Sequence, residues 1–222
     1  MREYFEKTLG VPSKNIYYKT NSDVSQAEFS KVFSEGGWLD KRIKDGQSDV
    51  FVYYAGHGLV NSETGEGFWL PVDADQEDES NWLLTDRIRS KIKVMPAKHV
   101  LVVADSCFSG KFTRSMTRGF TISPDATDYV PALQRLVGKR SRTVLTSGGL
   151  EPVLDSIGNS KHSVFANAFL SILGSNEKVL DGARLFQKIR FNVINNSSQT
   201  PEYSPIPEGG HDGGDFLFVR RY

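Results

Sequence analysis

Two stretches, VFVYYAGHG at residues 50–58 and VLVVADSCFSG at residues 100–110, decide the fold of this chain. Each begins as a short run of β-branched, aromatic and apolar residues between polar segments. Such a run is typical of a strand buried on both faces of a parallel sheet. Each run then ends on a reactive side chain, His57 in the first stretch and the single cysteine, Cys107, in the second. TVLTSG at 143–148 predicts a third strand of this kind.

Helical patterns lie before, between and after these runs. Strands that alternate with helices predict an α/β fold: a three-layer sandwich with a mostly parallel sheet, right-handed crossovers and helices on both faces. NIYYKT at 15–20 is rich in β-forming residues, and DFLFVRR at 215–221 predicts a last strand. The helices are expected at 2–9, where Gly10 closes the first, and at 22–33, 82–93, 163–173 and 180–195.

Length and composition fit one domain that spans residues 1–222. Lysine plus arginine and aspartate plus glutamate number 27 each, so no net charge favours nucleic acid or an anionic membrane. No apolar run is long enough to span a membrane, and MREYFEKTLG is charged where a signal peptide is apolar, which predicts a cytoplasmic protein. A lone cysteine provides neither an internal disulfide nor a zinc site of several thiolates.

The two strand ends suggest nucleophilic chemistry. Ligands of open α/β sheets bind beyond the carboxyl ends of the strands, so His57 and Cys107 reach one crevice if their strands are neighbours. An imidazole that takes the thiol proton makes the pair competent for acyl transfer. The Gly58 amide is placed to donate to a developing oxyanion. The alternative is that Cys107 is a small buried apolar residue and His57 an ordinary loop residue.

These stretches, with TVLTSGGLEPVLD at 143–155 and HSVFANAFLSIL at 162–173, resemble the caspase-type cysteine peptidases (peptidase family C14, caspase-hemoglobinase fold), in the metacaspase and bacterial caspase-like branch. Caspases carry a histidine about 50 residues before the cysteine, as here. The resemblance implies Cys107 as nucleophile, His57 as general base and acid, and the amides of Gly58 and Cys107 as oxyanion hole. It also implies a large-subunit-like part at about 1–110, a connection at 108–142 and a small-subunit-like part at 143–222.

Asp105 is the candidate floor of the substrate pocket. It lies two residues before Cys107 and therefore on the same face of the strand. A buried carboxylate suits a cationic partner, and metacaspases, which this chain resembles, carry aspartate here and cut after Arg or Lys. Glu151 and Asp155 are further candidates for the substrate cleft. Alternatively, Asp105 accepts backbone amides, and Glu151 and Asp155 are solvated loop acids.

The remaining expectations concern loops and partners. The 108–142 connection is expected to be mobile, and its basic residues offer sites for self-cleavage, at Lys111, Arg114, Arg118, Arg135, Lys139, Arg140 and Arg142. Residues 195–215 are expected to form a loop. The acidic run 73–80 offers oxygen ligands for calcium, which many metacaspases need, but it is more typical of a solvated loop, so no metal ligand and no cofactor are assigned.

Two rivals to an Arg- or Lys-specific peptidase stay open: an aspartate-specific peptidase and a catalytically silent module that binds partners. The expected partners are a protein or peptide substrate, and further domains or a regulatory protein. No apolar β-run precedes Asn15, whereas the family begins its sheet with such a strand. We therefore expect the first strand to be absent from the given sequence or to come from another segment or chain, or the sheet to be rearranged.

Overall fold

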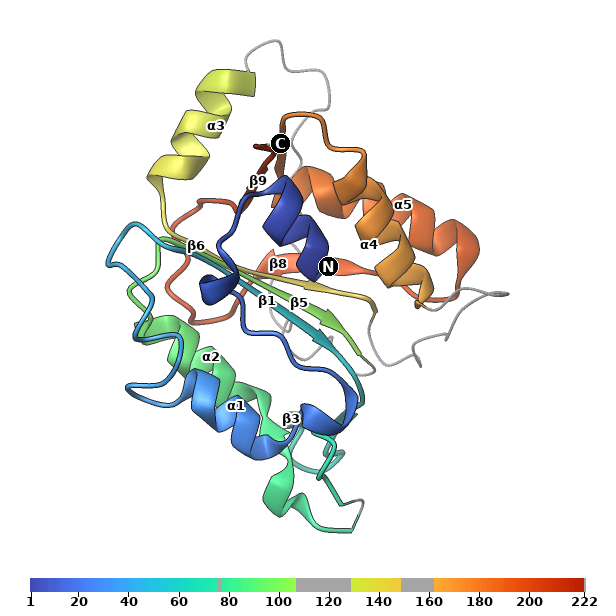
Figure 1. The fold of residues 1–222 in the computed structure, drawn as a ribbon. Helices are drawn as coiled ribbons and strands as arrows, with labels where there is room; N and C mark the ends of the chain where they lie inside the picture. Colours follow the sequence, from blue (N-terminus) through green and yellow to red (C-terminus); the bar gives the residue numbers. More distant parts are fainter. Residues whose placement is uncertain (76, 107–128, 149–161, 222) are drawn as a thin grey trace.

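The computed structural model describes residues 1–75, 77–106, 129–148 and 162–221. Its main sheet has four strands in the order β1 (Asp49–Ala55), β5 (His99–Asp105), β6 (Ser141–Thr146) and β8 (Glu202–Pro205) (Figure 1). The first three strands are parallel, and β8 is antiparallel to β6.

The sheet is sandwiched between two helical layers. Figure 1 shows α1 (Gln26–Phe33) and α2 (Thr85–Val94) on one face, and α4 (Val164–Gly174) and α5 (Gly182–Asn196) on the other. Two apolar clusters follow from the alternation of strand side chains, so Leu101 and Val103 pack toward α4 and α5, and Val100 and Val102 toward α2. The predicted α/β sandwich with a mixed, mainly parallel sheet is confirmed.

Polar residues fix where the helices begin. The Ser25 side chain accepts a hydrogen bond from the Glu28 amide at the start of α1, and Ser163 and Asp181 cap α4 and α5 in the same way. Each oxygen satisfies an amide that the first helical turn leaves without a partner. The N-terminal segment is less regular: it forms a π-helix at Tyr4–Thr8 and short 3₁₀ turns at Ser13–Asn15 and Asn21–Asp23.

Two small antiparallel sheets flank the main one. The first consists of β2 (Gly58–Val60), β3 (Gly67–Trp69) and β4 (Leu83–Leu84), the last preceded by a 3₁₀ turn at Glu79–Asn81. The second pairs β7 (Val179–Asp181) with β9 (Leu217–Val219). The strand predicted at 215–221 thus exists, but it joins β7 and not the main sheet.

Two sequence-based expectations about the connections are wrong. The 108–142 segment is not a loop throughout, because it ends in α3 (Tyr129–Gly138) and the start of β6. Residues 195–215 contain β8, whose backbone pairs with β6 although its side chains include serine and proline. The β-rich segment 15–20 forms no strand.

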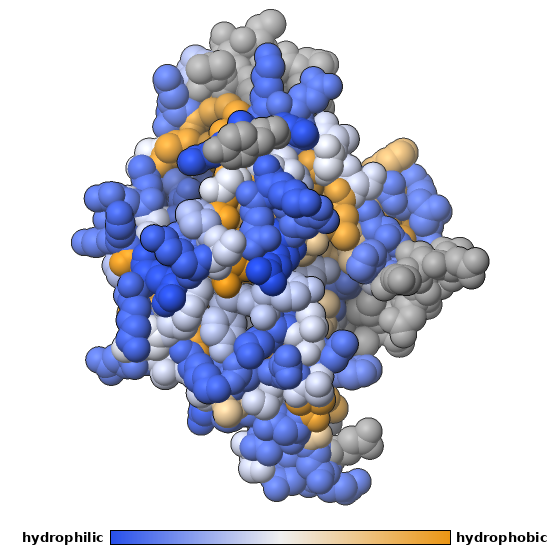
Figure 2. Space-filling model, in the orientation of Figure 1, coloured by the Kyte–Doolittle hydropathy of each residue, from blue (hydrophilic) through white to orange (hydrophobic). Residues whose placement is uncertain are grey.

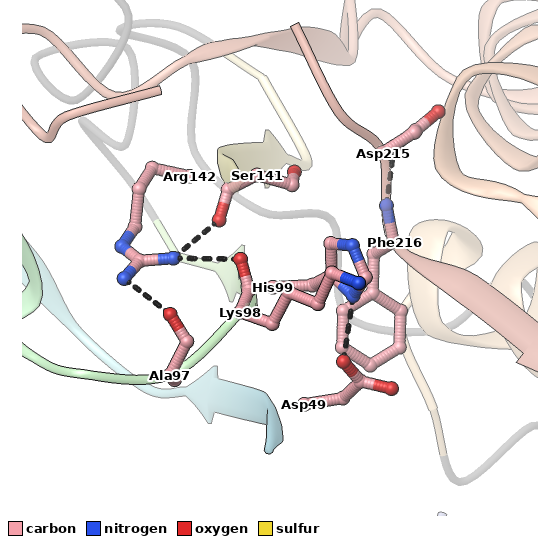
Figure 3. Close-up of polar contacts among 8 residues, drawn as sticks. All are labelled: Asp49, Ala97, Lys98, His99, Ser141, Arg142, Asp215 and Phe216. Atoms are coloured by element: carbon pink, nitrogen blue, oxygen red, sulfur yellow. Dashed lines mark hydrogen bonds and ion pairs between the residues drawn. The ribbon is translucent and has the colours of Figure 1, made fainter. Parts of the chain in front are cut away.

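Arg142 in β6 ties the amino-terminal end of the sheet together. Its side chain is fully buried, and its guanidinium nitrogens donate to five backbone carbonyls at 2.7–3.2 Å, those of Ile92, Met95, Ala97, Lys98 and Ser141. Figure 3 shows three of these bonds, with the nearby His99–Asp49 contact. Burial, and then the charge of Arg140, lowers the pKa of Arg142 to about 10. The carbonyls satisfy a charge that water would otherwise solvate.

None of the helices among the described residues is both long and apolar enough to cross a membrane.

Candidate active site

The carboxyl ends of β1 and β5 lie side by side. The register pairs Ala55 with Asp105, and the Gly56 amide continues the ladder by donating to the Asp105 carbonyl at 3.3 Å. His57 follows two residues after Ala55 and is exposed. The structure therefore confirms that the strands leading to His57 and Cys107 are neighbours, as the crevice hypothesis required.

The turn that carries His57 is held by Tyr54. The Tyr54 hydroxyl lies 2.7 Å from the His57 carbonyl and 3.2 Å from that of Leu70, and the Leu70 amide also donates to the His57 carbonyl at 3.0 Å. The Tyr54 ring stacks on Trp69, with ring centroids 4.2 Å apart. These contacts fix the backbone of His57 while its imidazole stays in solvent.

Gly56 is required by the same arrangement. A Cβ atom at this position would lie 2.7 Å from the Tyr54 hydroxyl oxygen, which is closer than side-chain atoms approach one another. The glycine before the histidine thus allows the tyrosine to cross beneath the turn.

The Gly58 amide points away from the small sheet. Gly58 pairs with Trp69, and the bond from the Leu70 amide to the His57 carbonyl identifies this as a non-hydrogen-bonded antiparallel pair. The Gly58 N–H therefore takes no part in the β2–β3 ladder. This orientation suits an oxyanion donor, the role that the sequence predicts for Gly58.

Asp105 forms the buried acidic part of the site. Its side chain is buried, and its Oδ2 atom accepts from the Ser163 hydroxyl at 2.5 Å and, more weakly, from the Tyr53 hydroxyl at 3.5 Å. Burial, and then the negative charge of Asp105, raises the pKa of Tyr53 well above its usual value. Tyr53 consequently stays protonated and remains a donor to the carboxylate.

His57 and Asp105, both predicted from the sequence, border one long groove. It has a volume of about 1160 Å³, and its lining includes His57, Asp105, Tyr53, His162 and Ser163 at the carboxyl end of β1. From there it follows β1 past the N-terminal segment. Figure 2 shows one face of the molecule as mainly hydrophilic, with apolar residues visible between hydrophilic ones.

Three predicted site residues, Cys107, Glu151 and Asp155, lie outside the described residues. In sequence, Cys107 is two residues beyond Asp105, as His57 is two beyond Ala55.

The other histidines and the acidic run have structural contacts. His99 Nδ1 lies 2.6 Å from Asp49 Oδ1, and His211 Nδ1 accepts from the Arg142 amide, both away from His57. In the acidic run, Asp75 and Asp78 accept from backbone amides two residues further along the chain. Within the described ranges there is no group of three or more His, Cys, Asp or Glu that could hold a metal ion.

Sequence reasoning missed Tyr53, Tyr54 and Ser163. Tyr53 was predictable. It lies two residues before Ala55, the strand-end residue beside Asp105, and therefore on the same face of β1. Ser163 carried a signal as the residue that begins a helix, but its second bond, to Asp105, depends on how α4 docks. The Tyr54 hydroxyl has no local signal at all.

Two comparisons with known proteins found matches. The family model described as the caspase domain matches residues 1–208 of the chain. Among solved structures, protein GSU0716 of Geobacter sulfurreducens is similar, with a TM-score of 0.45 and 15% sequence identity over 87% of this chain and 80% of that one. Curated proteins gave no match.

Proposed function

The chain belongs to the caspase-domain family, and on this premise we propose that it is a cysteine endopeptidase of the metacaspase and bacterial caspase-like branch, with Cys107 as nucleophile and His57 as general base. One observation carries the proposal: the β1–β5 register ends both strands at the same level, two residues before His57 and Cys107.

The reaction follows from these groups. His57 takes the thiol proton, and the Cys107 thiolate attacks the carbonyl carbon of the scissile bond. The Gly58 and Cys107 amides stabilise the oxyanion. The C–N bond then breaks, and His57 returns the proton to the leaving amine. Water, deprotonated by His57, hydrolyses the thioester and restores the free thiol.

We propose Arg or Lys as the residue before the cut. Asp105 supports this, because it is a buried carboxylate in the lining of the groove that also reaches His57. The Ser163 and Tyr53 hydroxyls that donate to Oδ2 are neutral and orient the carboxylate. A substrate guanidinium would supply the opposite charge. Glu151 and Asp155 remain proposed contributors to this cleft, and calcium a proposed activator.

Self-cleavage is proposed for the connection outside its helix and strand. Arg142 is fully buried in β6 and so out of reach of a cleft, and Arg135 lies in α3 and so is not in the extended backbone form that a peptidase cleft accepts. The proposed sites are therefore Lys111, Arg114, Arg118, Lys139 and Arg140. Intact mass after incubation, compared with Cys107→Ala, tests this: cleavage at Arg142 in the folded protein would contradict it.

The test of the function is hydrolysis of fluorogenic peptides that end in Arg, Lys or Asp, with and without calcium, and with Cys107→Ala as the blank. We expect turnover of Arg and Lys peptides that the blank lacks. Asp105→Ala should abolish that turnover but leave Cys107 open to alkylation near neutral pH, at a rate that depends on His57. Turnover of Asp peptides would keep the peptidase and refute the role of Asp105. No turnover and slow alkylation in folded protein would favour the binding module.

A further inference from the structure

The outer edge of β2 is open, and it begins at the proposed oxyanion donor, Gly58. In the small sheet, β2 pairs with β3 alone. His57 and Asn61, at the two ends of β2, form backbone hydrogen bonds with the β3 side of the hairpin. Residues of an antiparallel strand face their partner alternately, so Gly58 and Val60 direct their N–H and C=O groups away from β3. Among the described residues, no group forms a hydrogen bond with these outward-facing groups. An unpaired edge of this kind accepts an added strand.

The open edge and the candidate pocket lie on opposite faces of the main sheet. Asp105 accepts from Ser163 at the start of α4, on the face that α4 and α5 cover. Trp69, the partner of Gly58 in the hairpin, packs with α2 in the cluster on the other face. A substrate whose side chain before the cut enters the Asp105 pocket therefore crosses the end of the sheet toward β2. The residues that follow the cut are the ones that meet β2.

The segment that contains β2 is strongly acidic. Residues 58–84 include seven acidic residues and no lysine, arginine or histidine, although the chain as a whole has no net charge. The seven residues are Glu63, Glu66, Asp73, Asp75, Glu77, Asp78 and Glu79. All are exposed, and none forms an ion pair within the described part of the chain. Glu79 accepts from the Asn61 side chain at 3.5 Å, which brings the acidic run to the end of β2. The local field therefore favours a cationic chain along this edge.

We propose that β2 binds the substrate residues that follow the scissile bond as an added parallel strand, and that the acidic segment favours Lys or Arg among them. The inference rests on the proposed peptidase, because the register starts where the scissile carbonyl accepts from the Gly58 amide. The second residue after the cut then donates to the Gly58 carbonyl and accepts from the Val60 amide, and the fourth donates to the Val60 carbonyl. The first and third residues face away from β2. The fourth and later residues reach the loop at 61–66 and its carboxylates.

Cleavage of matched peptides by the wild type tests the backbone register. Each peptide has the same residues up to an Arg and five residues after it, with Lys at the fourth and fifth. Mass spectrometry quantifies only the product of the cut after that Arg. N-methylation of the second residue after the cut removes the N–H that bonds to Gly58, and it should lower kcat/KM at least tenfold. N-methylation of the third residue, whose N–H faces away from β2, should change kcat/KM less than threefold.

A second set of measurements tests the charge preference. A peptide with Glu at the fourth and fifth positions should have a kcat/KM at least tenfold below that of the Lys peptide. The double variant Glu63→Gln with Glu66→Gln should reduce this preference at least threefold. Glu177→Gln, which removes an exposed carboxylate outside the acidic segment, should leave the preference unchanged.

One variant tests the edge of β2 itself. Val60→Pro removes an outward-facing N–H at an edge position, where proline is tolerated. It should lower kcat/KM for the Lys peptide at least tenfold relative to that for an Arg-coumarin peptide, which has no residue after the cut. If the wild type does not turn over the coumarin peptide, the peptidase is refuted and this inference with it. If it does, the inference alone is overturned when the two N-methylated peptides are cut equally fast, or when the Lys and Glu peptides are.

Discussion

Replacement of Arg142 by methionine should destabilise the fold strongly, because the guanidinium satisfies carbonyls that have no other donor. Of its five acceptors, the carbonyls of Lys98 and Ile92 also accept from backbone amides, at 3.1 Å from Ser141 and 3.3 Å from Met95. The carbonyls of Met95 and Ala97 accept from Arg142 alone among the described residues, at 2.8 and 2.7 Å.

The magnitude follows from these two carbonyls. Both belong to buried residues, and a buried polar group without a partner costs about 1–3 kcal/mol. Arg142→Met should therefore lower the free energy of unfolding by about 2–6 kcal/mol, which is a large part of a typical total of about 5–15 kcal/mol. For a domain of this size the melting temperature should fall by roughly 10 °C.

Urea denaturation followed by circular dichroism measures the effect. Arg140→Met is the control, because it makes the same substitution at a neighbouring arginine that is exposed. Arg142→Lys should lie between the two, because an ammonium group has fewer donors and reaches only some of the carbonyls. An unfolding free energy for Arg142→Met within about 1 kcal/mol of Arg140→Met would refute the reasoning.

The site and one buried carboxyl group give three further expected outcomes. Gly56→Ala should push the Tyr54 hydroxyl off the His57 carbonyl and lower kcat/KM about tenfold or more, whereas Gly174→Ala, at an open position, should change little. Tyr54→Phe should lower kcat/KM by a similar factor. The double variant Tyr54→Phe with Gly56→Ala should lose little more, because both substitutions act through the Tyr54 hydroxyl, and additive losses would contradict this. Burial raises the pKa of Asp215 to about 6, so the folded state binds the proton more tightly and stability is lost as pH rises from about 4 to 6. Urea titrations should therefore show that the unfolding free energy of the wild type falls by roughly 3 kcal/mol relative to that of Asp215→Asn over this pH range. If the two proteins lose stability in parallel as pH rises, the reasoning is wrong.

The sequence was most informative where burial on both faces imposed a continuous apolar run. β1 and β5 were predictable for this reason, and with them the neighbouring positions of His57 and Asp105. β8 was not, because Glu202–Pro205 gains its strand conformation from pairing with β6 and not from its own side chains. From the sequence, Arg142 was placed among the basic residues of the 108–142 connection. Its buried role could not be predicted, because only folding brings the acceptor carbonyls around it.

The same distinction separates the predictable residues of the site from the others. His57, Gly58 and Asp105 follow strand ends, which a pattern of residues can locate. The groups that hold them are tertiary: the Tyr54 hydroxyl reaches Leu70 across the small sheet, and Ser163 reaches Asp105 from the start of α4. Neither contact can be predicted from the spacing of residues along the chain.

The segment at 15–20 shows why a local preference alone does not make a strand. Its residues favour extended backbone, and Ile16 and Thr20 adopt it, yet the segment pairs with no strand of the described structure because the groove separates it from β1. Among the described residues, the outer side of β1 also lacks a paired strand, so Phe51, Val52 and Tyr53 are only partly buried. The unpaired extended backbone at 15–20 and the partial burial of β1 thus have one physical cause, the groove that lies between them.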